Sequence, residues 1–451
     1  MVLRPLEKLE AFWIRINGRW VHLSEEFLER HPGGRVITLY KNKDATHVFK
    51  MFHYGSNKAE KMLRALKCQT ELPDAVAAAQ KSVTTTDTED EINMGRFTMS
   101  SEKSEAIKED YDVLVRAAED AGLMEPDHGY YALKFVSTVS LLLLAVWLQS
   151  VQYYMLSAMV LALAWQQLGW MIHEYCHHEH YKNRFLNDCM AYVVGGLLQG
   201  FSPSGWKEQH NIHHAATNVV GRDGDIDLLP LWALVPDDLR MLFKHKSEAW
   251  LRLLPYQHLY WSVMLPGLRL SWLVQSVTFV AAMRKHFFKC YRDRFAVEAV
   301  CLSVHWVAVL LQLYMLPDAT TRVLYFLVSQ LLGGFLISHV VTFNHYSVEK
   351  FSNDSPLLEN YACLQLYTTR NMRSNALVDW LWGGLNFQIE HHLFPTMPRH
   401  NLKRATRLVK AFATKHRLPY MEDDYWTGFA LIIKQLAAIA HSADKLQQKI
   451  E

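Results

Sequence analysis

This sequence has few cysteines, little net charge and no apolar stretch at its N-terminus. It has 6 cysteines in 451 residues and no Cys-x-x-Cys pair, which predicts reduced thiols and no disulfide framework. The formal net charge is +2 and no long run of Lys or Arg is present, so nucleic acid binding has no electrostatic basis. The N-terminus lacks the apolar stretch of a cleavable signal peptide. We therefore expect a chain whose N-terminus stays in the cytosol and that binds no nucleic acid.

The length exceeds that of one compact soluble core, so we expect two units, one of them in a membrane. Residues 1–80 contain short apolar stretches and a turn signal at Asn17-Gly18, which indicate a small soluble domain. Residues 81–128 begin with a stretch rich in Ala, Thr, Asp and Glu that buries little apolar surface, and they are predicted as a linker. Residues 129–430 are predicted as the membrane domain, and residues 431–451 as a cytosolic C-terminal tail.

Four apolar segments are near the length that crosses about 30 Å of hydrocarbon. They form two hairpins, at residues 132–148 with 151–172 and at 295–316 with 323–343. Both short connections carry at most one basic residue, whereas the N-terminus, residues 173–290 and the C-terminus hold nearly all Lys and Arg. The positive-inside rule then places both chain ends in the cytosol. Two weaker apolar stretches, 190–201 and 258–283, are predicted as interfacial or re-entrant.

The 23 histidines are concentrated in three clusters with helical spacing. The first is His-Glu-Tyr-Cys-His, the second is His-Asn-Ile-His-His, and the third is Gln-Ile-Glu-His-His. Their candidate ligands are His173, His177, His210, His213, His214, Gln388, His391 and His392. The predicted hairpins bring all three clusters to one membrane face. Imidazoles suit first-row metals, and the ligands are too many for one tetrahedral zinc, so we expect two irons. Two irons can use O₂ to take hydrogen from an unactivated CH₂ group.

These clusters resemble the three histidine boxes of the membrane fatty acid desaturases. The resemblance extends through the motifs Trp-Gln-Gln at 165–167, His-Ala-Ala-Thr-Asn at 214–218 and Asp-Trp-Leu-Trp-Gly-Gly-Leu-Asn at 379–386. The third box begins with Gln388 instead of a histidine, and in this it resembles the box of the front-end subgroup. Members of that subgroup insert a double bond between an existing double bond and the carboxyl end. Glu174 stands where an Asp is commoner. The resemblance makes His345, just past the fourth span, a further candidate metal ligand, whereas His339 is expected to face elsewhere.

The N-terminal region contains His31-Pro32-Gly33-Gly34 and, further along, Phe52-His53. This pattern resembles the cytochrome b5 fold, in which two histidines bind haem iron from opposite sides. The resemblance implies that His31 and His53 are the haem ligands and that the domain transfers electrons rather than binding oxygen. Tethering such a one-electron carrier raises its effective concentration at the metal face.

The sequence therefore predicts a multidomain fold, in which a small α+β haem domain precedes an all-α membrane domain with about four spans and a cytosolic di-iron cap. The resemblance implies a Δ6 or Δ5 acyl desaturase of the endoplasmic reticulum membrane, supplied by NADH-cytochrome b5 reductase. A b5-fused sphingolipid desaturase or fatty acyl hydroxylase is the alternative within enzymes, and a non-catalytic membrane haem electron carrier is the alternative of another class. A metal transporter is disfavoured because the histidines gather at one face. The sequence leaves open the carbon oxidised, the chain length preferred and the oligomeric state. It also leaves open whether the substrate is a polyunsaturated acyl-CoA or a phospholipid, and whether His339 or His345 is an additional metal ligand.

Overall fold

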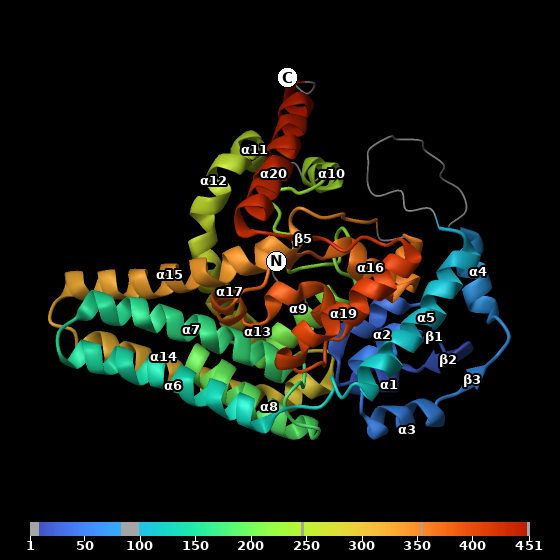
Figure 1. The fold of residues 1–451 in the computed structure, drawn as a ribbon, viewed down its shortest axis with the longest axis horizontal. Helices are drawn as coiled ribbons and strands as arrows, with labels where there is room; N and C mark the ends of the chain where they lie inside the picture. Colours follow the sequence, from blue (N-terminus) through green and yellow to red (C-terminus); the bar gives the residue numbers. More distant parts are fainter. Residues whose placement is uncertain (1–8, 83–98, 245–247, 353–354, 449–451) are drawn as a thin grey trace.

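The computed structural model describes residues 9–82, 99–244, 248–352 and 355–448. A small domain at the N-terminus lies against a larger helical body (Figure 1). The fold class matches the one predicted, with a three-stranded sheet in the small domain and a body that is mostly helical.

The N-terminal domain is built on a β-hairpin whose turn is Asn17-Gly18. Both turn residues have positive φ, 50° and 74°, as a two-residue hairpin turn of this kind requires. The first strand alternates buried and less buried side chains, and the hairpin covers a core that includes Leu28 and Met51. The elements of the domain are β1 (Phe12–Ile16), β2 (Arg19–Leu23), α1 (Glu25–Arg30), η1 (Gly34–Tyr40), α2 (Thr46–Phe52), α3 (Asn57–Ala65) and β3 (Cys68–Gln69).

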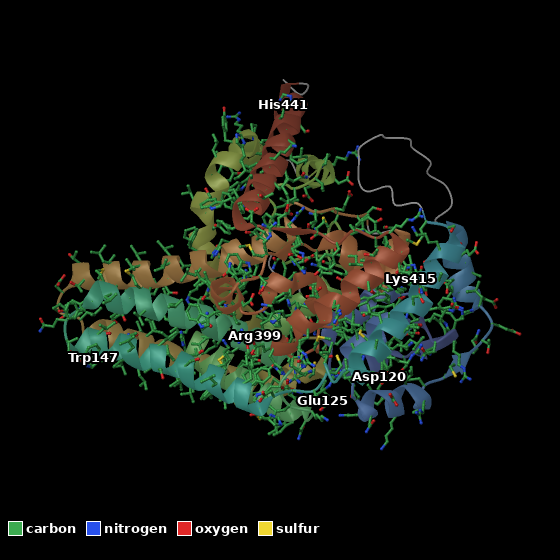
Figure 2. The ribbon with its side chains drawn as sticks, viewed as in Figure 1. Asp120, Glu125, Trp147, Arg399, Lys415 and His441 are labelled. Carbon is green, nitrogen blue, oxygen red and sulfur yellow. The ribbon has the colours of Figure 1, made fainter. Side chains whose placement is uncertain are left out.

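Four long helices of the body lie side by side and extend away from the N-terminal domain (Figure 1). They are α6 (His128–Ser150), α7 (Tyr154–Cys176), α14 (Lys289–Tyr314) and α15 (Ala319–His345). Leu143 and Val146 on α6 and Val307 and Leu310 on α14 are exposed, as expected of side chains that face lipid. Trp147 lies at the far end of this bundle, whereas the charged Glu125 and Lys415 lie toward the N-terminal domain (Figure 2).

By length and composition, five helical segments can cross a membrane, one more than the four predicted. The additional segment is Leu254–Met283, of which residues 258–283 were predicted as interfacial or re-entrant. It is divided at Pro266 into α12 (Gln257–Met264) and α13 (Leu268–Met283), joined by η4 (Leu265–Gly267). Its α12 part stands across the bundle, whereas α13 packs against α14 and α15 (Figure 1). With 16 residues, α13 spans about 24 Å, which is less than the hydrocarbon thickness.

Two segments predicted as linker and tail contain packed helices. Within 81–128 lies α5 (Ser101–Asp120), which buries Ile107 and Tyr111 completely against the body. The acidic, Thr-rich part of that segment lies outside the described residues. Within 431–451 lies most of α20 (Tyr425–Gln448), which buries Ile432 and Leu436 against α12. A helical apolar stripe is hard to recognise when the neighbouring composition is polar, which is why both helices were missed.

Helix α4 (Asp74–Ser82) lies beside the N-terminal domain, at the side away from the bundle (Figure 1). The remaining elements form a cap over the end of the bundle that faces the N-terminal domain, together with helices beside α20. They are α8 (Arg184–Ala191), the π-helical η2 (Tyr192–Gln199), α9 (Pro203–Ala215), α10 (Pro236–Lys244), α11 (Glu248–Leu253), η3 (Leu254–Tyr256), η5 (Pro356–Glu359), α16 (Tyr361–Thr368), β4 (Asn371–Met372), α17 (Ala376–Leu381), η6 (Leu385–Phe387), α18 (Gln388–Leu393), α19 (Arg399–His416) and β5 (Glu422–Asp423).

Candidate metal centre and haem site

Four helices deliver the candidate metal ligands to one point at the end of the bundle. The first cluster lies at the C-terminal end of α7, the second on the last turns of α9, and the third on α18. His345 is the last residue of α15. The start of α9 is fixed by Ser202, which caps the helix and also bonds the buried carboxylate of Glu298 on α14.

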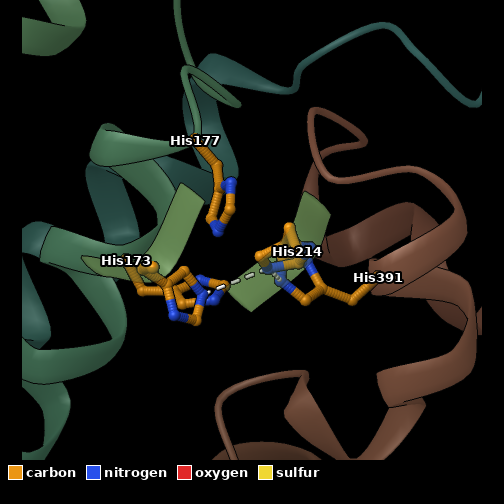
Figure 3. A group of neighbouring side chains, drawn as sticks. His173, His177, His214 and His391 are labelled. Atoms are coloured by element: carbon orange, nitrogen blue, oxygen red, sulfur yellow. Dashed lines mark hydrogen bonds between the residues drawn. The ribbon is translucent and has the colours of Figure 1, made fainter. Parts of the chain in front are cut away.

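The histidines divide into two groups, and within each group the ligand atoms all lie within 4.8 Å of one another. Four members of the larger group are labelled in Figure 3, where His173 and His177 from the end of α7 converge with His214 and His391, and His210 is the fifth member. The smaller group is His213, His345 and His392. Every histidine predicted from the three clusters, together with His345, therefore falls in one of two adjacent groups.

The ring nitrogens of both groups fit bound metal ions better than they fit one another. Nε2 of His173, of His177 and of His392 is buried without a hydrogen-bond partner among the described residues. Nε2 of His214 lies 3.1 Å from Nε2 of His210 and 3.1 Å from Nε2 of His391. Since two neutral imidazole nitrogens need a proton between them, these contacts cannot all be satisfied at once without a cation. The donor set is nitrogen-rich, as first-row transition metals prefer.

Hydrogen bonds to Nδ1 orient the rings so that Nε2 faces the centre of each group. Nδ1 of His210 lies 2.7 Å from Asp225 and Nδ1 of His213 lies 2.8 Å from Asp223. Asp227, the third aspartate of this loop, instead pairs with Lys350. Such carboxylates fix the tautomer and increase the basicity of a metal-binding imidazole.

The second group has similar supports. Nδ1 of His392 lies 2.9 Å from the side-chain oxygen of Gln365, and Nδ1 of His345 lies 3.0 Å from the carbonyl of Thr368. In all four rings an oxygen atom accepts a hydrogen bond from Nδ1, so the proton of the neutral ring is on Nδ1 and Nε2 is left to bind a metal.

Burial and neighbouring imidazoles determine the charge of these rings. Burial, with His392 and His177 nearby, holds the pKa of His214 well below its usual range, and burial does the same to His391. Burial also lowers the pKa of His210. For His213 the effect of burial is outweighed by Asp223, so the pKa of that ring is raised. Neutral imidazoles are the form that binds a metal ion.

Gln388 lies beside the smaller group. Its amide nitrogen lies 3.0 Å from Nε2 of His345, and its oxygen accepts a hydrogen bond of 3.0 Å from Asn344. The side chain is thus at the predicted place, but in this arrangement its oxygen bonds Asn344. The amide must turn over to present that oxygen to a metal.

An apolar cavity of about 260 Å³ opens beside the metal centre. Its wall includes Trp170, Phe201, Trp272 and Ile337. The polar part of the wall includes members of both histidine groups, His173, His210, His213 and His345, together with Gln388. A hydrocarbon chain in this cavity would lie directly against the candidate ligands.

Other histidines lie outside the two groups and have their own partners. His339 bonds the carbonyl of Phe335 at 2.7 Å and contacts Trp382, so it is a packed helix residue, as expected. His178 lies 3.2 Å from Asp188, and His305 lies 3.0 Å from the carbonyl of Leu197. His180 stacks on Tyr131. Glu174 is not among the candidate ligands, because it forms a buried ion pair of 2.7 Å with Arg399.

Several supporting residues were missed by sequence reasoning. Gln365, Asn344, Thr368 and Arg399 lie far from their partners along the chain, and single Gln, Asn, Thr or Arg residues carry no spacing signal. The histidine boxes could be recognised because helical periodicity places their members on one face.

The haem site predicted in the N-terminal domain also has the geometry it needs. The ring centroids of His31 and His53 are 6.3 Å apart, on either side of a cavity of about 370 Å³. Nδ1 of His53 bonds the carbonyl of Phe49 at 3.0 Å, which leaves Nε2 for a metal. Nδ1 of His31 is buried without a partner among the described residues. With iron-nitrogen bonds of about 2 Å on each side, rings at this separation fit one iron between them.

The haem cavity reaches the metal centre. His177, a member of the larger histidine group, also lines the haem cavity, together with Cys176 and Thr396 of the body. The larger histidine group therefore borders the haem cavity through His177 and the apolar cavity through His173 and His210.

The N-terminal domain docks closely on the body. Arg184 of the body donates hydrogen bonds of 3.0 and 3.3 Å to the carbonyls of Phe52 and Tyr54. Gly34, with φ of 69°, packs where any Cβ would collide with Tyr291 and Glu208 of the body. The second glycine of the His-Pro-Gly-Gly motif therefore permits close approach of the body.

Comparisons with known proteins agree with both sites. Residues 145–424 match the family model for fatty acid desaturases, and residues 4–69 match that for the cytochrome b5-like haem or steroid binding domain. The chain is 52% identical over 456 residues to the Delta(5) fatty acid desaturase fat-4 of Caenorhabditis elegans, which covers 100% of both chains. It is 45% identical to the Delta(6)-fatty-acid desaturase fat-3 of that organism, over 95% of this chain and 96% of the relative. Identity to a Delta(8)-fatty-acid desaturase of Euglena gracilis is 35%, over 92% of this chain and 93% of the relative.

Proposed function

Because the chain belongs to the fatty acid desaturase family and carries a cytochrome b5-like haem domain at its N-terminus, we propose that it is a front-end desaturase of polyunsaturated acyl chains. It inserts a cis double bond at the Δ5 or Δ6 position. The higher identity to the Delta(5) relative, 52% against 45%, favours Δ5. The observation that carries this proposal is the apolar cavity whose wall contains members of both histidine groups.

The reaction balances when two electrons and two protons are supplied. One O₂, two electrons and two protons remove two hydrogens from adjacent CH₂ groups and yield one double bond and two waters. Two non-haem irons, when bound, supply the chemistry that reduces O₂ and takes hydrogen from the unactivated chain. The chain's own residues hold the substrate, keep water out and orient the ligands.

We assign the ligands to two metals by the division of the histidines. His173, His177, His210, His214 and His391 hold one iron, and His213, His345 and His392 hold the other. Gln388 completes the second set, either with its amide turned so that the oxygen is a ligand or as a donor that orients a metal-bound water. Asp223 and Asp225 keep the rings of His213 and His210 in the ligating tautomer.

The apolar wall determines how an acyl chain lies against these ligands. Trp170 and Trp272 are rigid and bulky, and they confine a hydrocarbon chain more sharply than flexible side chains would. Most of the wall is apolar, so the chain displaces water from the part of the centre where hydrogen is removed. Selection of one pair of carbons follows from this confinement, since proximity and orientation decide which C–H bonds react.

We propose that electrons enter through the haem held between His31 and His53. His177 lines the haem cavity and belongs to the larger histidine group, so an electron can pass from the haem to this group without crossing another part of the protein. The upstream donor is NADH-cytochrome b5 reductase, and the protein lies in the endoplasmic reticulum membrane with both ends in the cytosol. Four crossings by α6, α7, α14 and α15 give this topology, with the bent segment Leu254–Met283 at the cytosolic side.

The proposed function is tested by expressing the chain in a host that lacks polyunsaturated fatty acids and feeding it defined acyl chains. Mass spectrometry then locates the new double bond. A bond on the carboxyl side of an existing one supports the front-end assignment, and its position distinguishes Δ5 from Δ6. A hydroxylated product or an unsaturated sphingoid base would instead support the alternative enzymes.

A further inference from the structure

The haem cavity lies between the two domains, and its two walls differ in character. The wall from the N-terminal domain is mostly apolar, with Lys58 as its one charged residue. The wall from the desaturase body carries Arg184, Asp188, Lys207 and Arg294. Most of the charged side chains in the cavity therefore come from the desaturase body, whereas the haem ligands come from the N-terminal domain.

The charged wall is a connected cluster. Nζ of Lys207 lies 2.5 Å from one oxygen of Asp188 and 3.0 Å from Nε2 of His178. Arg294 bonds the other oxygen of Asp188 at 3.2 Å. The side chains of Lys207 and Asp188 are only 11% and 19% exposed, so water screens their charges poorly.

The net charge of this wall is positive. Burial opposes ionisation of Asp188, but Lys207, His178 and Arg294 together hold its pKa below the usual range. The body thus presents three cations, Arg184, Lys207 and Arg294, against one carboxylate.

Haem b has an apolar ring and two propionates on one edge, which carry two negative charges. The cavity has a matching division, because the apolar wall suits the ring and the surplus of two positive charges suits the propionates. We propose that the desaturase body completes the haem site, with Lys207, Arg184 and Arg294 holding the haem propionates and thereby raising the reduction potential of the haem in the assembled chain.

The backbone around both haem ligands is held by the body in the same way. Arg184 bonds the carbonyls of the two residues that flank His53. The thiol of Cys290 lies 3.8 Å from the carbonyl of His31. These contacts hold the segments that carry the two haem ligands against α8 and α14.

The proposal has an electrostatic consequence for electron transfer. Reduction of haem iron adds a negative charge, and nearby partly buried cations stabilise that charge more than water-screened ones do. The haem is then reduced more readily when the domain is docked, at the point where its cavity borders His177. This inference rests on the haem ligation by His31 and His53 proposed above. The absorption spectrum of the unmodified chain tests that ligation separately.

The test uses the full chain in nanodiscs, loaded with haem, and compares four variants with the unmodified chain. Lys207→Met and Arg294→Gln remove a cation from the wall, Lys207→Arg keeps it, and Lys61→Met removes an exposed cation of α3 that does not line the cavity. Spectroelectrochemical titration gives the midpoint potential, and resonance Raman spectroscopy follows the propionate bending band. We expect Lys207→Met to lower the equilibrium constant for reduction about tenfold, which is a shift of about 59 mV for one electron. The propionate band shifts with it.

Lys207→Arg and Lys61→Met are expected to match the unmodified chain. A midpoint potential and propionate band in Lys207→Met and in Arg294→Gln equal to those of Lys61→Met would overturn the proposal. Arg294→Gln decides the question if Lys207→Met does not accumulate. Absence of a bis-histidine haem spectrum in the unmodified chain would instead refute the haem ligation itself.

Discussion

Asp225 accepts a hydrogen bond of 2.7 Å from Nδ1 of His210, and this contact turns the other ring nitrogen toward the larger histidine group. Asp223 does the same for His213 of the smaller group. Each of the two candidate metal positions is therefore supported by one aspartate from a single loop. One short loop, which contains Asp223 and Asp225, therefore orients a ligand in each of the two histidine groups.

Asp225→Asn is expected to weaken iron binding, because an amide oxygen can accept from Nδ1 of His210 but carries no charge, so it does not increase ring basicity as a carboxylate does. The expected loss of metal affinity is about 10- to 100-fold. Iron per chain, measured by mass spectrometry of the purified protein, should fall together with desaturation. Asp237→Asn, which changes a carboxylate paired with the exposed Arg240, is the matched control and should retain its iron. Normal iron content in Asp225→Asn would show that the aspartate does not support the metal.

The histidine boxes and the haem pair could be predicted from the sequence because each rests on a spacing. His210, His213 and His214 share a helix face, and the His-Pro-Gly-Gly motif is followed 22 residues after its histidine by His53. The supports from Gln365, Asn344 and Arg399 could not be predicted, since their contacts join distant segments. The apolar stretch at 258–283 was found from the sequence, but its division into α12 and α13 around Pro266 needed the structure. The prediction that Gln388 is a metal ligand remains to be tested, because its oxygen here bonds Asn344.

Gln388→Ala is expected to abolish desaturation, because it removes both the amide beside His345 and the acceptor of Asn344. Gln388→His is expected to lose most activity as well, since a rigid ring with a stronger nitrogen donor changes the geometry and potential of the site. Product yield is measured beside the haem spectrum and the protein level, which should both stay normal. Near-normal yield with normal iron in Gln388→Ala would show that the site closes around the histidines alone.

Gly34→Ala is expected to disturb the docking of the N-terminal domain while leaving its haem in place. An alanine there is strained by the positive φ, and its Cβ would collide with Tyr291 and Glu208. Turnover driven by NADH and reductase should fall, and added soluble cytochrome b5 should restore part of it. Gly55→Ala, at a positive φ with no atom near the built Cβ, is the control for backbone strain alone. Equal turnover in the two variants would argue against a docking role for Gly34.

The His286 ring predicts a dependence of stability on pH. Burial lowers the pKa of His286 to about 4, and Nδ1 accepts a hydrogen bond from the backbone of Phe288, so the folded state needs the neutral ring. In the unfolded chain the ring takes up a proton below about pH 6.5. The contribution of His286 to the free energy of unfolding is therefore fully present above about pH 6.5 and is lost as the pH falls to about 4. His286→Gln keeps an acceptor that does not titrate, and its thermal stability should change less over this interval. Parallel curves for the two proteins would contradict the assignment.

His53→Ala is expected to remove the six-coordinate haem spectrum without removing non-haem iron, because the two sites use separate ligands. Absorbance of the reduced and oxidised full chain gives the haem state, and metal analysis of the same sample gives the iron that remains. His22→Ala, on strand β2, provides a histidine control outside the haem cavity. An unchanged spectrum in His53→Ala would place the second haem ligand elsewhere.

The central claim is that two adjacent histidine groups act on an acyl chain held in the apolar cavity beside them. Membranes containing the unmodified chain or His214→Ala are supplied with NADH, reductase and one defined polyunsaturated acyl substrate, and the products are mapped by mass spectrometry. We predict a product with two fewer hydrogens and a new double bond on the carboxyl side, formed by the unmodified chain and absent with His214→Ala. The same product from both proteins, or an oxygenated product from the unmodified chain, would contradict the claim.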